Sequence, residues 1–282
     1  MYRLIFILLL HFSFFLYSAD EPAVFDDEKT IELLKDKLQK IHRENGFSDI
    51  NLLYDQLTRK TCKVALTKEL SKEKNLQEIY KSSLKSVVMI VRAYKSQSSH
   101  SWQTSVACGF LISKDGIAVT NYHVMEPSRG TAMAAMTFDK QVFVISEVLA
   151  ADKVNDIAVV KLKGDGFTPL SISTENSTGR SVLCISHPDG RLYTLSNGIV
   201  SRHFMDSDKG VKAHRFAISA DFAKGSSGGP VLDLKGNVVG MVSSTRSIYY
   251  NKSAGIDENL QMVIKNCVPS QSILKLIKVP AK

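Results

Sequence analysis

The sequence predicts an all-β fold, a barrel or a sandwich, with helices added before and after the strands. Between residues 87 and 243 it contains short runs rich in β-branched residues, and turn signals separate these runs. No long helical pattern alternates with them, which disfavours a parallel α/β sheet. With 44% apolar and 23% charged residues, the 282-residue chain has the composition of a folded globular protein.

The first residues predict a signal peptide over residues 1–19. Arg3 precedes an apolar run over residues 4–16, and small residues follow it up to Ala19. The alternative is an uncleaved membrane anchor, because Tyr17 is bulky where a signal peptidase prefers a small residue, although the run is short for a bilayer span. We therefore expect a secreted or periplasmic protein with no stable membrane insertion after signal cleavage.

Residues 20–75 are predicted to form an N-terminal helical segment, ahead of a domain over residues 76–282. A second short helix is predicted near residue 48 and a third at Asn75, where Glu78 completes a capping-box pattern. The apolar stripe is short, which favours packing against the rest of the protein, and an oligomer through this segment is the alternative. In the first helix, after two possible aspartate caps, the stripe consists of Ile31, Leu34, Leu38 and Ile41.

Six strand-like runs and a last helix follow. Turn signals lie between several of the runs, as at Lys114-Asp115-Gly116 and Pro188-Asp189-Gly190. The last helix is predicted over Ser270–Lys278 and is expected to pack on the strands. The runs cover residues 87–93, 106–112, 141–148, 156–162, 181–185 and 237–243.

Charge and cysteine patterns exclude several classes of function. The formal charge of +8 comes from Lys and Arg scattered among nearly as many acids, and even the basic stretch 59–74 lacks interleaved aromatics, so no nucleic-acid binding is predicted. The cysteines form no metal-ligand pattern, so neither a metal nor another cofactor is predicted. In an exported protein they can form disulfides, with three possible pairings of Cys62, Cys108, Cys184 and Cys267.

Three segments carry residues typical of nucleophilic catalysis, in the order His, Asp, Ser. The first is a predicted β-hairpin that ends in Thr120-Asn121-Tyr122-His123-Val124, and the second is Asn155-Asp156-Ile157-Ala158 at the mouth of a buried strand. The third is the glycine-rich turn Gly225-Ser226-Ser227-Gly228-Gly229-Pro230. Each segment alone is a weak signal, because glycine, serine and histidine are common in loops. Their conjunction is a strong one.

The chemistry explains why these residues are needed together. A serine hydroxyl is a weak nucleophile near neutral pH, so Ser227 needs a nearby base, a role suited to His123 with an ordinary pKa of about 6.5. Asp156 would hold the imidazole tautomer and stabilise the imidazolium. The backbone N–H groups of Gly225 and Ser227 would form an oxyanion hole.

The segments resemble the chymotrypsin-like (trypsin-like) serine peptidases in the order of the triad, and the bacterial high-temperature-requirement (HtrA/Deg) proteases in the wording of the motifs. The resemblance includes Ser83–Val91, residues 184–201 and Cys267-Val268-Pro269, and so covers about residues 76–277. It implies a chymotrypsin-like double β-barrel with the triad in the cleft between the barrels. It also implies a serine endopeptidase that acts on polypeptide substrates through an acyl-enzyme. No PDZ domain, which Deg proteases usually carry, is expected after the last predicted helix.

The same resemblance suggests substrate-binding residues. Asp221 stands six residues before Ser227, a spacing similar to that of the acid in the specificity pocket of trypsin, and we favour the alternative of a structural role. A substrate-pairing strand is expected at Ser243, Ser244 and Thr245, where a peptide would bind by β-addition. Lys224 could reach the cleft and favour an acidic side chain, although simple solvation is the plainer interpretation.

The sequence also gives hypotheses about two cysteines and about alternative functions. Cys108 resembles the bridged cysteine of animal trypsin-like enzymes, but the residue after His123 is Val124, so Cys108 is either a buried thiol or paired elsewhere. Cys62 is predicted to tie the helical segment to the barrels through Cys184 or Cys267.

The alternative function is a catalytically silent trypsin-like fold that binds peptides or proteins as a chaperone or scaffold. An esterase would use the same triad.

Overall fold

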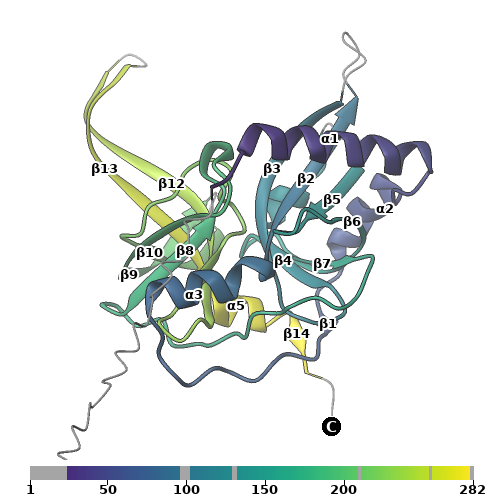
Figure 1. Ribbon diagram of the computed structural model, residues 1–282. Coiled ribbons are helices and arrows are strands. Elements are labelled where there is room, and N and C mark those ends of the chain that lie inside the picture. Colours follow the sequence, from purple (N-terminus) through teal and green to yellow (C-terminus); the bar gives the residue numbers. More distant parts are fainter. Residues whose placement is uncertain (1–23, 96–101, 129–131, 209–210, 254–255, 280–282) are drawn as a thin grey trace, which may run out of the picture.

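The computed structural model describes residues 24–95, 102–128, 132–208, 211–253 and 256–279, and the predicted signal peptide, residues 1–19, lies outside them. This part of the chain forms two closed β-barrels (Figure 1). The strand order is β2-β3-β4-β7-β6-β5 in the first barrel and β10-β13-β12-β11-β8-β9 in the second. The double barrel predicted from the sequence is therefore confirmed.

The register of the first barrel brings two of its strand ends together. Thr120, the last residue of β4, pairs with Ala158 near the start of the antiparallel strand β7. The segments that follow β4 and precede β7 therefore meet at one end of the barrel. The strands are β2 (Val87–Lys95), β3 (Trp102–Leu111), β4 (Ile117–Thr120), β5 (Ala132–Met136), β6 (Val142–Asp152) and β7 (Ile157–Leu162), with the short helix α4 (Tyr122–Met125) after β4.

The second barrel holds the glycine-rich turn ahead of its strand β11. Val231 of β11 pairs with Cys184 of β8 on one side and with Gly240 of β12 on the other. The long β12–β13 hairpin extends beyond the barrel (Figure 1). The strands are β8 (Ser181–Ser186), β9 (Thr194–Asp208), β10 (Val211–Ile218), β11 (Pro230–Leu232), β12 (Val238–Ser253) and β13 (Ile256–Pro269), with the 3₁₀ turn η3 (Pro188–Gly190) after β8.

The N-terminal segment packs on the first barrel through α1 (Asp27–Arg43), α2 (Ile50–Asp55) and η1 (Gln56–Thr58). Leu34 and Leu38 of the predicted stripe are fully buried in a core shared with the barrel. This is the packing role expected for the stripe, and an oligomer through the segment stays a prediction. Within the described residues, no helix has the length and apolar character needed to cross a membrane.

Helical structure in this segment ends earlier than predicted. Residues 59–75 run extended across to the second barrel and include only the short strand β1 (Cys62–Lys63). The predicted capping box opens α3 (Leu76–Ser83), which η2 (Leu84–Ser86) follows. In that box the Glu78 N–H donates to Asn75 Oδ1 at 2.9 Å, and the Asn75 N–H donates to Glu78 Oε2 at 3.1 Å.

Two predictions near the last strands are wrong. The helix expected over Ser270–Lys278 is only α5 (Ser270–Leu274), because the chain then pairs β14 (Ile277–Lys278) with β1 in parallel. All four cysteines are free thiols, so no disulfide ties Cys62 to the barrels. Backbone pairing makes that connection instead: the Cys62 N–H donates to Leu276 O at 2.8 Å. Cys108 is the buried thiol of the two alternatives.

Candidate active site

His123 and Asp156 form a hydrogen-bonded pair at the end of the first barrel. His123 lies on α4, directly after β4, and Asp156 directly precedes β7, so the strand register places them together. The His123 Nδ1 atom is 3.0 Å from both carboxylate oxygens of Asp156, and the His123 backbone N–H also donates to Asp156 Oδ1 at 3.1 Å. The arrangement fixes the ring with Nδ1 toward the acid and leaves Nε2 for another partner.

Asp156 itself is held in an uncommon backbone conformation. Its φ is +59°, in the left-handed region that Asp tolerates better than most residues. The side-chain amide of Asn121 donates to Asp156 O at 3.0 Å and supports this conformation. Sequence reasoning gave Asn121 no role of its own, although it stands within the Thr-Asn-x-His motif.

Ser243 has a side-chain role that the sequence did not suggest. It was expected to bind substrate, but its hydroxyl donates to Asp156 Oδ2 at 2.7 Å, and the residue is only 8% exposed. Asp156 therefore accepts hydrogen bonds from both barrels. Local sequence patterns hold no signal for a contact between residues 87 positions apart.

The surroundings of His123 bear on its protonation. Burial of the ring alone would lower the pKa of His123, but the hydrogen bond to Asp156 and the charges of Asp156 and Glu126 outweigh it and hold the pKa above its ordinary value. Since the side chain is still 46% exposed, it can exchange protons with a substrate in the cleft. The pair has the arrangement of a general base with its orienting acid.

The glycines of the Ser227 turn permit close contacts between the barrels and within the second one. Gly228 has φ +88°, and a Cβ there would lie 2.0 Å from Cys108 O. Gly225 has φ +93°, and a Cβ there would lie 2.5 Å from His187 O. Across the interface, the Cys108 N–H donates to Ser227 O at 2.8 Å. The turn is therefore clamped against both barrels.

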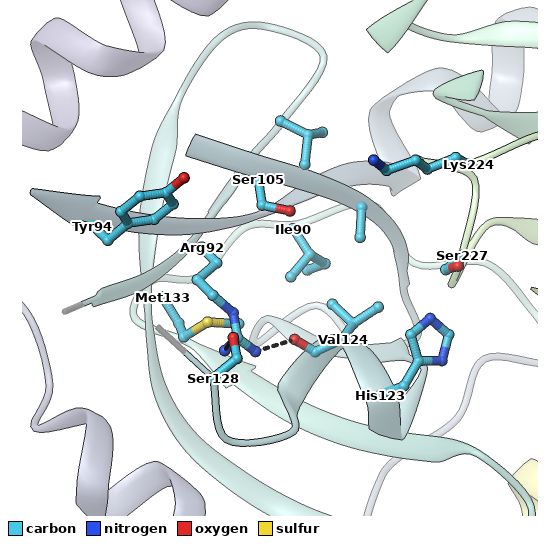
Figure 2. Close-up of a pocket in the computed structure, with 13 residues that line it drawn as sticks. Ile90, Arg92, Tyr94, Ser105, His123, Val124, Ser128, Met133, Lys224 and Ser227 are labelled. Atoms are coloured by element: carbon cyan, nitrogen blue, oxygen red, sulfur yellow. Dashed lines mark hydrogen bonds between the residues drawn. The ribbon is translucent and has the colours of Figure 1, made fainter. Parts of the chain in front are cut away.

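Ser227 lies beside His123 but is not hydrogen-bonded to it among the described residues. Both residues line the same cavity, and Figure 2 shows them at one end of it. The Ser227 hydroxyl donates to Ser243 O at 3.3 Å. Within the described part of the chain, neither the Gly225 N–H nor the Ser227 N–H has a hydrogen-bond acceptor. The oxyanion site predicted at these two amides stays a prediction.

The remaining predicted substrate residues lie outside this cavity. Asp221 forms an ion pair with Lys265, whose Nζ is 2.5 Å from Asp221 Oδ1, and this contact lowers the pKa of the carboxyl. Its side chain is 84% exposed, and the structural role that we favoured stays a prediction. Ser244 and Thr245 are exposed on β12, where Ser244 Oγ accepts a hydrogen bond from Asn266 Nδ2 at 3.4 Å.

Comparison with known proteins agrees with this architecture. Residues 107–241 match the family model described as a trypsin-like peptidase domain. A relative from Brucella suis, "Probable periplasmic serine endoprotease DegP-like", is 30% identical over 191 residues, which cover 66% of this chain and 36% of that protein. A relative of the same name from Hahella chejuensis is 32% identical over 157 residues, 54% of this chain and 31% of that protein. The chain thus spans about a third of the length of these relatives.

Solved structures show the same fold. The HtrA-type protease AlgW with a tripeptide has a TM-score of 0.57 and 19% identity, and the match covers 72% of this chain and 62% of that one. AlgW with a decapeptide has a TM-score of 0.58 and 18% identity, over 71% of this chain and 66% of that one. At such identities the likeness extends to the fold alone.

Proposed function

Because this chain contains a trypsin-like protease domain of the HtrA/Deg type, we propose that it is a serine endopeptidase with His123, Asp156 and Ser227 as its catalytic triad. The observation that carries the proposal is the His123–Asp156 pair, at 3.0 Å, beside a serine in a turn with two unpaired backbone N–H groups. This combination supplies a base, a nucleophile and an oxyanion site in one cleft.

The reaction follows from these positions. In the proposed reaction the Ser227 hydroxyl turns from Ser243 O to His123 Nε2, which takes the proton as the oxygen attacks the peptide carbonyl. The Gly225 and Ser227 N–H groups stabilise the oxyanion, and His123 then gives its proton to the leaving amine. Water then attacks the acyl-enzyme: His123 takes a proton from the water and gives it to the Ser227 oxygen as the acyl product leaves. Asp156 stabilises the imidazolium through its hydrogen bonds to His123 Nδ1.

A fluorophosphonate probe tests the proposal directly. We expect covalent labelling of the mature protein, with mass spectrometry placing the label on Ser227 and Ser227→Ala abolishing it. Ser226→Ala is the matched control, because Ser226 is buried, bonded to Ser186 Oγ at 3.0 Å, and adjacent in the same turn. Digestion of unfolded casein should follow the labelling. A folded protein that neither labels nor cleaves casein would refute the assignment.

The catalytically silent alternative has one observation in its favour. Ser227 bonds to Ser243 O rather than to His123, so the nucleophile is not aligned in the structure. A peptide-binding scaffold would retain affinity for unfolded casein without turnover or labelling. Catalytic hydrogen bonds often tighten only when substrate is bound, and we therefore place the endopeptidase first.

We also propose that the protein works in the periplasm or outside the cell. The similar proteins from Brucella suis and Hahella chejuensis are named as periplasmic, and residues 1–19 have the pattern of an export signal. Fractionation of cells that express the full chain, with N-terminal sequencing of the exported form, tests both points. A form that remains intracellular with its first residues intact would refute them.

A further inference from the structure

The cavity beside Ser227 lies against the first barrel. It has a volume of about 610 Å³, and its described lining comes from β2, β3, α4, β5, the residue Ser128 and the Ser227 turn. Figure 2 shows Ile90 near the middle of the cavity, and Met133 and Tyr94 on the side opposite His123. None of the described lining residues belongs to β12, the strand expected to pair with substrate.

Arg92 places a buried positive charge in this lining. The residue is 9% exposed, and its guanidinium donates only to uncharged acceptors among the described residues. The acceptors are the carbonyl oxygens of Val124 and Glu126, at 2.8 Å each, and the hydroxyls of Ser128 and Tyr54. These bonds hold the chain after α4, and within the described part of the chain the charge of Arg92 has no carboxylate partner.

Lys224 adds a second positive charge on the opposite side of the cavity. Figure 2 shows its side chain extending over the cavity from the turn that carries Ser227. The Lys224 carbonyl accepts a hydrogen bond from the Asp189 N–H at 2.6 Å, which fixes the base of the side chain. The Asp189 carboxylate itself pairs with Arg191 at 2.8 Å. Lys224 Nζ has no ion-pair partner in the described part of the chain.

Among the described residues that line the cavity, no acidic side chain balances these two cations. The described lining contains no Asp or Glu. The Glu126 side chain, next to the Arg92 anchor, is engaged by Lys153 Nζ at 2.6 Å. A cleft lined by charge of one sign attracts the opposite sign, so the cavity favours an anionic group.

The direction of the peptide chain decides which part of the substrate enters this cavity. This step rests on the proposed function. The acyl half of the peptide stays on Ser227 and is proposed to run along β12 at residues 243–245. The amine half departs with a proton from His123, and it must therefore extend past His123 toward the first barrel. The cavity lies on that side.

We propose that this cavity binds the leaving-group side of the substrate and selects a carboxylate there, with Lys224 as a specificity-determining residue. The carboxylate belongs either to an Asp or Glu side chain or to the end of the polypeptide. The buried Arg92 adds positive charge to the cavity, while the Lys224 side chain contacts the carboxylate. Lys224 is also the residue that can be substituted without disturbing the fold.

Paired peptides test the inference on the mature full-length protein. A fluorescently labelled peptide with one casein-derived cleavage sequence and an amidated C-terminus is made with either Glu or Gln at each of the first three positions after the cleaved bond. A shorter peptide that ends soon after that bond is made with a free and with an amidated C-terminus. We expect kcat/KM about fivefold higher for Glu than for Gln at one position, mainly through KM, and a ratio that falls toward one at high salt. Preference for the free end over its amide would identify the terminal carboxylate as the source.

Variants assign the preference to Lys224. Lys224→Glu should reverse the Glu-to-Gln ratio, whereas Lys212→Gln, an exposed lysine of β10 outside the cavity lining, should leave it unchanged. Anisotropy of the same labelled peptides on Ser227→Ala measures the preference without turnover. Equal binding and equal hydrolysis of the Glu, Gln, free and amidated peptides would overturn the inference. A binding preference without any hydrolysis would overturn only the proposed function.

Discussion

The first barrel holds His123 tightly against Asp156, whereas in the second barrel the Ser227 hydroxyl has, among the described residues, a single long hydrogen bond to Ser243 O of β12. The acid and the base share a barrel, and the register of β4 and β7 brings them together, while the second barrel adds one hydrogen bond from Ser243 to Asp156. The nucleophile and the two amides reach them only across the interface between barrels. The proton-accepting pair is therefore preorganised within one barrel, while alignment of the nucleophile depends on how the two barrels are held together.

The largest expected effect comes from breaking the first-barrel pair with Asp156→Asn. Asn tolerates φ +59° as Asp does, so the fold should persist, but the amide cannot hold the same tautomer or stabilise the imidazolium. We expect kcat to fall about 10⁴-fold, with near-normal circular dichroism. Asp165→Asn, in an exposed loop, is the control. A fall of less than tenfold would mean that Asp156 is not the orienting acid.

The second-barrel half is tested by Gly225→Ala. The new Cβ would stand 2.5 Å from His187 O, so the turn must shift and one oxyanion donor must move. We expect kcat to fall roughly 10²- to 10³-fold with a smaller change in KM. Gly179→Ala separates the two causes, because Gly179 also has positive φ, +89°, but open space at its Cβ. Equal losses in both variants would show that strain in the backbone, not the oxyanion site, is responsible.

The contrast between the halves also marks what the sequence could reveal. The triad motifs and the Asn75–Glu78 capping box are patterns of residues close together in the sequence, so they can be recognised without knowing the fold. The link from Ser243 to Asp156 joins two barrels, and no spacing rule predicts it. Arg92 likewise gains its place in the cavity only when β2 packs beside the chain after α4.

Several strands were missed for compositional reasons. The Ala-Met run of β5, residues 132–136, consists of helix-favouring residues, although all five are buried in the barrel. The outer parts of β12 and β13 extend beyond the barrel, where apolar residues such as Ile248 and Leu260 are exposed among polar ones, so they lack the continuous apolar run of a buried strand. The end of the predicted last helix became β14 because β1, more than two hundred residues earlier, offers it a partner.

A smaller effect is expected where the N-terminal segment joins the barrels. The Phe25 ring lies 5.7 Å from that of Tyr193 and 6.0 Å from that of Phe138, residues that precede β9 and β6 of different barrels. Phe25→Ala should lower the free energy of unfolding by about 1–2 kcal/mol in urea titrations, since the ring is only partly buried. Val24→Ala, at a residue that is 90% exposed, should change nothing. Equal free energies of unfolding for the two variants would show that Phe25 does not connect the two barrels.

The smallest effect concerns the base itself. His123 must be neutral to accept the Ser227 proton, so activity is lost as pH falls through its pKa, which Asp156 and Glu126 raise. Glu126→Gln removes one of these charges, and the acidic limb of kcat/KM should move to lower pH by about 0.3 unit at low salt.

Lys153→Gln gives the opposite control for that prediction. Lys153 pairs with Glu126 at 2.6 Å, so its removal leaves the Glu126 charge less compensated and should move the limb to higher pH. High salt should shrink both shifts, because Glu126 and Lys153 are exposed charges. If both variants moved the limb in the same direction, the surface charges would be acting on the fold of α4 rather than on the proton affinity of His123. The first-barrel pair would then be less rigidly preorganised than its hydrogen bonds indicate.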